Sequence, residues 1–140
     1  METLTWKTRI ALLWVLMVVA DLAHSVLVVW EQGGQEKMIH RLEVMGAAGL
    51  LFEAFFSLIP LWMTFVTMTT RMPWNRWSNL LLGIAFTALN IFHFFLCGVP
   101  LIQGGPVSGP TAHHILLVGS TVVATGLITW YAWKWPAETD

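Results

Sequence analysis

The residues best suited to chemistry are Asp21 and His24, which interrupt a long apolar run near the start of the chain. Their three-residue spacing places a carboxylate and an imidazole on one face of a helix. Residues 10–30 otherwise form an apolar stretch of membrane-spanning length, for which about 20 residues suffice. A charge-capable side chain inside a bilayer costs roughly 2.5–3.5 kcal/mol on insertion scales. We therefore expect both side chains to face the interior of a helix bundle, opposite other polar groups.

The composition is that of an integral membrane protein. Of the 140 residues, 56% are hydrophobic and only 11% are charged, and tryptophan occurs nine times. This is too apolar for an ordinary soluble domain, so we expect a lipid bilayer as the main partner. The formal net charge of −1 argues against nucleic acid as a partner, because phosphate binding needs a basic patch.

The hydropathy pattern predicts an all-α fold, with residues 1–140 forming a single transmembrane four-helix bundle. The four helices are predicted over residues 9–30, 44–70, 76–98 and 111–134. Pro60 is expected to kink the second helix because it removes one backbone donor. Residues 35–43 are weakly amphipathic and fit either a short surface helix or a solvated loop. The Gly- and Pro-rich residues 99–110 fit an ordinary loop or a lid.

The charge distribution predicts the orientation in the membrane. Lys37 and Arg41 fall on one side of the predicted bundle, and the other five basic residues fall on the opposite side: Lys7, Arg9, Arg71, Arg76 and Lys134. The positive-inside rule then places both termini in the cytoplasm, and a multi-pass protein of the bacterial inner membrane is expected. Most tryptophans on the cytoplasmic side are predicted to form an interfacial belt: Trp6, Trp74, Trp77, Trp130, Trp133 and Trp135.

The polar residues inside the predicted spans fall at matching depths. With a rise of ~1.5 Å per residue, three of them lie about 12–13 Å from the outer side: Asp21, Glu53 and Asn90. Three histidines lie nearer to that side, roughly 5–9 Å in: His24, His93 and His114. Small and polar residues continue along the same helix faces at three-to-four spacing. The sequence therefore predicts a polar cavity in the outer half of the bundle, with a wall from each helix.

The first hypothesis for this cavity is acid–base chemistry on a lipophilic small molecule, as in an isomerase, cyclase or hydrolase. Two carboxylates in an apolar site are expected to differ in proton affinity, so that one donates a proton while the other accepts one. Asp21 and Glu53 are the predicted acid and base, and His24, His93 and Asn90 are predicted to orient groups or relay protons. Further contacts to the ligand are expected from His114, Trp14, Trp62, Ser57 and Thr121.

The alternative hypothesis is a metal or haem site. Asp21 with His24, and Asn90 with His93, resemble the carboxylate-x-x-His spacing of di-iron bundles, although Asn is a poor substitute for a bridging carboxylate. Zn or Fe held by histidines and one carboxylate is compatible with the spacing, and haem b held by two histidines is a related case. The candidate ligands are Asp21, His24, Glu53, His93 and His114.

Three further alternatives stay open at this stage. Intramembrane carboxylates also occur in proton-coupled transporters. A small apolar protein of this kind can form a homo-oligomer or serve as an accessory subunit of a larger membrane complex. Buried polar residues can also simply pair with one another and hold membrane helices together.

Three segments resemble a family of small four-span bacterial membrane proteins of unknown function. They are the Lys7–Asp21 stretch with Trp14, the Asn75-Arg76-Trp77 turn, and the C-terminal block Trp130–Trp135, which reads WYAWKW. The resemblance implies four spans and acidic site positions at Asp21 and Glu53. Thr121 stands where an acidic residue is expected in that family. The resemblance implies no particular activity.

Overall fold

The computed structural model describes residues 2–30, 34–102 and 109–135, which are almost entirely helical. The four helices are α1 (Glu2–Trp30), α2 (Gly34–Thr69), α3 (Trp74–Ile102) and α4 (Gly109–Lys134). Each contains a segment long and apolar enough to cross a bilayer. Hydrocarbon offers no hydrogen bonds to the backbone, so spanning segments satisfy their own amides as helices. The chain is a small multi-span membrane protein.

The helices extend beyond the predicted bounds. α1 begins at Glu2 instead of residue 9, and α3 continues to Ile102 instead of ending at residue 98. Residues 35–43 belong to α2, so the loop alternative for them was wrong. Hydropathy marks only the apolar part of a helix, whereas the Lys, Glu and Gln residues before the first two spans are good helix formers and lengthen α1 and α2 at their N-terminal ends. The extension of α3 runs instead through apolar residues. Residues 103–108 lie outside the described residues, so the loop and lid alternatives there stay predictions.

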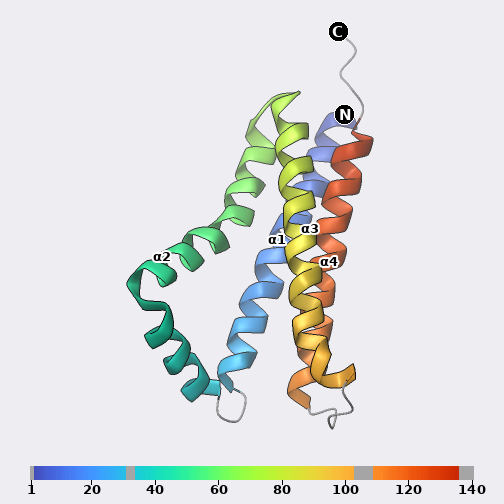
Figure 1. Ribbon diagram of the computed structural model, residues 1–140. Coiled ribbons are helices and arrows are strands. Elements are labelled where there is room, and N and C mark those ends of the chain that lie inside the picture. The colour runs from blue at the N-terminus through green and yellow to red at the C-terminus, as the bar shows by residue number, and fades with distance from the viewer. Residues whose placement is uncertain (1, 31–33, 103–108, 136–140) are drawn as a thin grey trace.

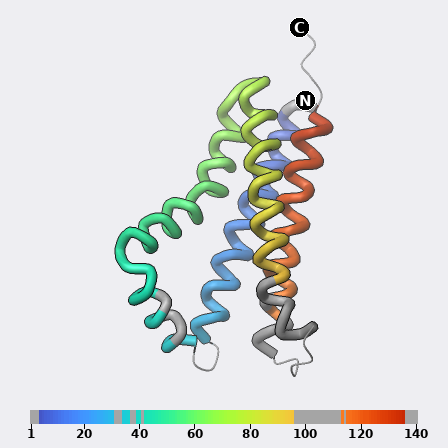
Figure 2. The backbone as a smooth tube through the Cα atoms, in the orientation of Figure 1, coloured from blue at the N-terminus to red at the C-terminus, as the bar shows by residue number. Residues whose placement is uncertain are grey.

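The four helices do not pack equally (Figure 1). α3 packs along α4, α4 along α1, and α1 along α2, whereas α2 and α3 make few contacts with each other. The result is a close bundle of α1, α3 and α4, with α2 bowed away from α1 at the middle of its length. The N-terminus, the C-terminal end of α4 and the α2–α3 turn lie together at one end, which we call the termini end (Figure 2).

The bow in α2 has a local cause at Gly46. Its backbone angles are φ 62° and ψ −178°, which are not helical. A Cβ atom makes this region of conformational space very costly, so glycine is almost the only residue that occupies it. The break allows the two parts of α2 to run in different directions. The predicted kink at Pro60 stays a prediction, and the sequence analysis had not singled out Gly46.

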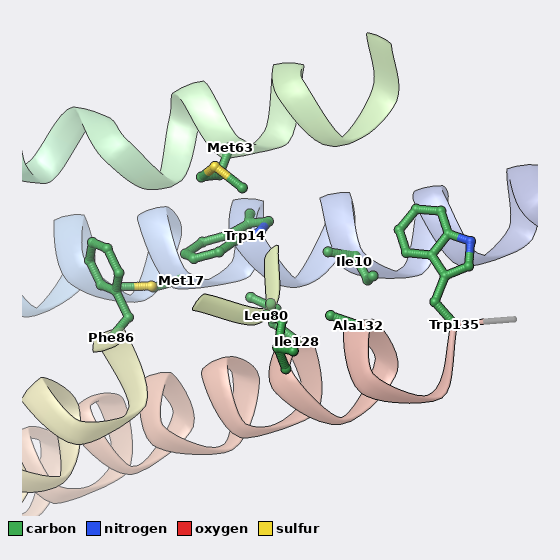
Figure 3. Packing of buried hydrophobic residues seen from close by; sticks show 9 residues of the cluster. All are labelled: Ile10, Trp14, Met17, Met63, Leu80, Phe86, Ile128, Ala132 and Trp135. Atoms are coloured by element: carbon green, nitrogen blue, oxygen red, sulfur yellow. The ribbon is translucent and has the colours of Figure 1, made fainter. Parts of the chain in front are cut away.

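The apolar core lies toward the termini end (Figure 3). It contains Ile10, Trp14, Met17, Met63, Leu80, Phe86, Ile128, Ala132 and Trp135. Trp135 is only 2% exposed, so it packs in this core and not in the interfacial belt that was predicted for it. Trp74, Trp77, Trp130 and Trp133 are exposed, as expected for interfacial residues. Most other large apolar side chains are exposed along the spans, where lipid replaces water as their solvent.

Candidate functional site

A cavity of about 480 Å³ lies between α1 and the bowed α2, beside α3. Its polar lining comes from three helices: Asp21, His24 and Ser25 of α1, Glu53 and Ser57 of α2, and His93 of α3. The cavity is present because α2 packs against α1 but makes few contacts with α3. Two carboxylates and two imidazoles from three spans therefore line one cavity.

The apolar part of the cavity lining consists mainly of aromatic and thioether side chains. Phe52 stacks on Phe56 with ring centroids 6.2 Å apart, and Phe56 stacks on Phe86 at 4.9 Å. Met17 and Met45 complete the apolar lining. Phe52 is the outermost ring of the stack and is 70% exposed. The cavity is thus amphiphilic, with a carboxylate-rich side and an aromatic side.

A second, small cavity of about 30 Å³ lies on the other side of Asp21, between α1, α3 and α4. Asp21, His24 and His93 line both cavities, and Asn90 and Thr121 line only the small one. This volume is enough for one water molecule, which needs roughly 10–15 Å³. The Asn90 side-chain nitrogen is buried and has no hydrogen-bond partner within the described part of the chain. A water molecule would satisfy it.

The ionisable groups are close enough to influence one another. The His24 and His93 rings meet edge to face across α1 and α3, with centroids 5.6 Å apart and planes at 85°. Asp21 interacts electrostatically with both His93 and Glu53. Two ionised carboxylates repel strongly in a low-dielectric region, whereas a carboxylate and an imidazolium attract.

Two tryptophans predicted to contact a ligand line neither cavity. Trp14 is fully buried and donates a hydrogen bond from Nε1 to Asn79 Oδ1 at 2.7 Å. Trp62 is 63% exposed on the outside of α2. The backbone of His114 belongs to α4, but its side chain lies outside the described residues, so its predicted contact stays a prediction.

The hydroxyl groups of the threonines in α4 form hydrogen bonds within their own helix. Thr121, Thr125 and Thr129 of α4 each donate to a carbonyl three or four residues earlier in the same helix, at 2.8–3.0 Å. Such back-bonding needs no partner on another helix. A threonine stripe in a membrane helix is therefore weak evidence for a polar cavity, and only Thr121 of these three lines one.

The sequence analysis missed a buried polar network near the termini end. Asn79 Oδ1 accepts from Trp14 Nε1 at 2.7 Å and from Thr67 Oγ1 at 3.0 Å. Asn79 Nδ2 donates to Asn75 Oδ1 at 2.8 Å, and Asn75 Nδ2 donates to the Thr67 carbonyl at 2.7 Å. The available signal was the four-residue spacing of Asn75 and Asn79 at the start of α3, which puts both amides on one face.

The candidate metal ligands do not assemble into a site. Among the described residues, no three His, Cys, Asp or Glu side chains are grouped closely enough to hold a metal ion. Asp21, His24, Glu53 and His93 share a cavity of about 480 Å³ without converging on one point. The described part of the donor set is therefore a poor fit for Zn or Fe, and the haem b alternative stays a prediction.

Comparison with known proteins identifies no family. No family model matches the chain, no curated protein is similar to it, and no solved structure matches its fold. The resemblance to small four-span bacterial proteins stays a prediction.

Proposed function

We propose that the protein binds a lipophilic small molecule in the large cavity and performs acid–base chemistry on it. The observation that carries the proposal is the convergence of Asp21, Glu53, His24 and His93 on one cavity that also has an aromatic wall. Ligand pockets typically combine a mostly apolar lining with a few polar groups that fix orientation. A volume of about 480 Å³ falls within the usual range for such pockets, roughly 300–1,000 Å³.

The position of the cavity supports a ligand that arrives from the lipid. Asp21 and Ser57 are exposed although they lie within candidate spans, Leu4–Trp30 and Leu42–Thr69. An exposed carboxylate within a membrane span is costly unless water or a ligand solvates it. Because α2 and α3 make few contacts with each other, the proposed route for a lipophilic molecule is lateral entry between them, without crossing the aqueous phase.

In this proposal Asp21 and Glu53 act as the acid and the base. Because two negative charges repel in a low-dielectric cavity, the pair is expected to hold one proton, as coupled carboxylates do elsewhere. His24 and His93 then exchange protons with Asp21, and Asn90 orients a water molecule in the small cavity. Ser57 supplies a hydroxyl for the polar group of the ligand.

We also propose that the termini end faces the cytoplasm of a bacterial inner membrane. The support is the gathering of basic side chains there: Lys7 Nζ donates to the Thr70 carbonyl at 2.7 Å, and Arg76 donates to the carbonyls of Ala132 and Trp133. Arg9 lies over the rings of Trp6 and Tyr131 at 5.8 and 5.9 Å. Positive charge and aromatic rings together are typical of the cytoplasmic interface.

The test of the function is the identity of what co-purifies. Protein reconstituted in lipid nanodiscs is expected to retain a lipophilic molecule that native mass spectrometry detects, at about one per chain. Asp21→Asn and Glu53→Gln are expected to reduce retention, whereas Glu43→Gln, an exposed position outside both cavities, leaves it unchanged. Equal retention by all variants would sink the proposal, and a stoichiometric metal or a Soret band would favour the alternative.

A further inference from the structure

The charge of the cavity narrows the class of ligand. Its ionisable lining consists of Asp21, Glu53, His24 and His93, and no described lysine or arginine side chain lines either cavity. With neutral histidines the formal charge reaches −2, and nothing in the lining offers a fixed positive charge. Fatty acids and phospholipid phosphates are abundant amphiphiles, but a carboxylate-rich cavity at low dielectric repels them. The complementary amphiphile is neutral or cationic.

The aromatic wall favours a cation over a neutral molecule. Phe52 has one face on Phe56, and its exposure leaves the other face available. A cation over an aromatic face gains about 0.5–1 kcal/mol at exposed sites and more when it is desolvated. Phe56 and Phe86 continue the wall toward the core, so an apolar body attached to the cation can lie along them.

We propose that the ligand is a lipophilic organic cation, a protonated amine or a quaternary ammonium, held between the two carboxylates and the Phe52–Phe56–Phe86 wall. This proposal rests on the proposed function, because it uses the same cavity. It adds that the ligand competes with protons. The carboxylate pair of the empty cavity holds one proton in the proposed function, and this proton offsets part of its negative charge. When a cation enters, a carboxyl group gives up its proton to the solvent, so one positive charge replaces another.

The pH dependence follows from this exchange. Asp21 is faced by His24 on its own helix, by Glu53 of α2 and by His93 of α3, while α4 contributes Leu117, Val118 and Thr121, none of which titrates. Raising the pH removes protons from all of these ionisable groups and makes the cavity more negative. Affinity for a permanent cation must therefore rise with pH, and affinity for a neutral ligand of the same shape must not.

A matched set of probes tests the proposal. Tetraphenylphosphonium is a permanent cation, tetraphenylborate is its anionic counterpart of the same shape, and triphenylmethanol is a neutral relative. Binding is measured by equilibrium dialysis to the full chain in nanodiscs of zwitterionic phospholipid, with empty nanodiscs subtracted. We expect tetraphenylphosphonium to bind at least about tenfold more tightly than triphenylmethanol, a ratio equivalent to about 1.4 kcal/mol. Tetraphenylborate should not bind above empty discs, and cation affinity should rise between about pH 5.5 and about pH 8.

Variants locate the binding. Asp21→Asn and Glu53→Gln are each expected to weaken tetraphenylphosphonium binding about tenfold and to flatten its pH dependence. Glu43→Gln makes the same chemical change as Glu53→Gln on the same helix but outside the cavity, and it should leave binding unchanged. Helical circular dichroism of each variant separates lost binding from lost folding. Should either site variant fail to fold, Phe52→Leu tests the same cavity from its exposed wall, with a several-fold weakening expected.

Each other outcome is decisive. If triphenylmethanol binds as tightly as the cation, the cation proposal is overturned while the proposed lipophile site stands. If none of the three probes binds above empty discs, both proposals fail. If Glu43→Gln weakens cation binding as much as Glu53→Gln, the cation binds at the surface and the cavity is not its site.

Discussion

The two ends of the molecule treat the polar groups of their helices in opposite ways. Near the termini end, the Asn79 side chain accepts from Trp14 and Thr67 and donates to Asn75, so each amide atom has a partner. Toward the other end, Asp21, Glu53 and His93 line a cavity, and the buried Asn90 nitrogen makes no hydrogen bond among the described residues. One region joins its polar groups to one another, and the other places them along a cavity.

The difference has a geometric origin in α2. Its C-terminal part is tied to the bundle, because the Thr67 hydroxyl and carbonyl both join the asparagine network. Toward the break at Gly46 the helix bows away from α1, and Glu53 and Ser57 lie between this break and the network (Figure 1). Where α2 is held, the polar groups of the helices meet and saturate one another. Where α2 is not held, the polar groups line the large cavity.

The largest expected effect comes from breaking the network. Asn79→Leu keeps the number and connectivity of the side-chain heavy atoms but leaves the Trp14 Nε1–H and the Asn75 Oδ1 without these partners in a buried site. An orphaned buried polar group costs about 1–3 kcal/mol, so we expect the free energy of unfolding to fall by about 2–4 kcal/mol. Unfolding in mixed micelles with increasing dodecyl sulfate, followed by tryptophan fluorescence, measures it.

Asn90→Leu is the matched control, since it makes the same substitution on the same helix. Its amide nitrogen makes no hydrogen bond to any described residue, so we expect a change within about 1 kcal/mol. Equal losses for Asn79→Leu and Asn90→Leu would remove the distinction between the two ends.

The next largest effect comes from the close contact between α3 and α4. A Cβ added at Gly83 would lie 2.7 Å from Thr129 Oγ1 and 3.2 Å from the Thr129 backbone nitrogen. Overpacking of this kind costs typically 1–3 kcal/mol, so Gly83→Ala should lower stability by about that amount in the same assay. At Gly119 the nearest atom is Phe94 Cε2 at 3.6 Å, an ordinary contact, and Gly119→Ala should be tolerated. If Gly83→Ala and Gly119→Ala lowered stability equally, α3 and α4 would not pack more tightly at Gly83 than at Gly119.

The sequence alone could predict the class of fold and much of the lining of the cavity. Hydropathy marks spans directly, and the fixed rise of a helix gives the depths of Asp21 and Glu53. It could not predict that α2 separates from α3, because Gly46 and Gly49 look alike in sequence and only one breaks the helix. The sequence pattern also overestimated how many threonines face a cavity, since a hydroxyl that bonds its own helix has the same spacing as one that faces a cavity.

The break in α2 can be tested without changing any contact. Gly46→Ala places a Cβ where no atom lies within 4 Å, so its whole effect comes from the backbone angle φ 62°. Strain in this region costs about 1–3 kcal/mol, and either stability falls by about that much or α2 straightens and the cavity changes shape. Gly126→Ala is the control, because its Cβ also meets nothing but its helix is regular. It should be neutral or raise stability by about 0.5–1 kcal/mol. A neutral Gly46→Ala with unchanged probe binding would contradict the role given to the break.

The smallest expected effect on stability is at the carboxylates, and it separates a functional site from simple helix pairing. If Asp21 and Glu53 held helices together, Asp21→Asn would lower the free energy of unfolding as Asn79→Leu does, because both would leave buried partners unsatisfied. If they are kept available for a ligand, Asp21→Asn removes a costly charge-capable group from mid-membrane and leaves the bundle intact. We expect Asp21→Asn to change the free energy of unfolding by no more than about 1 kcal/mol, and any change to be toward greater stability. We expect the same variant to lose ligand binding. Glu43→Gln fixes the baseline for a carboxyl-to-amide change at an exposed position. A residue whose removal costs binding but not stability is a site residue, and the reverse result at Asp21 would make it part of the scaffold.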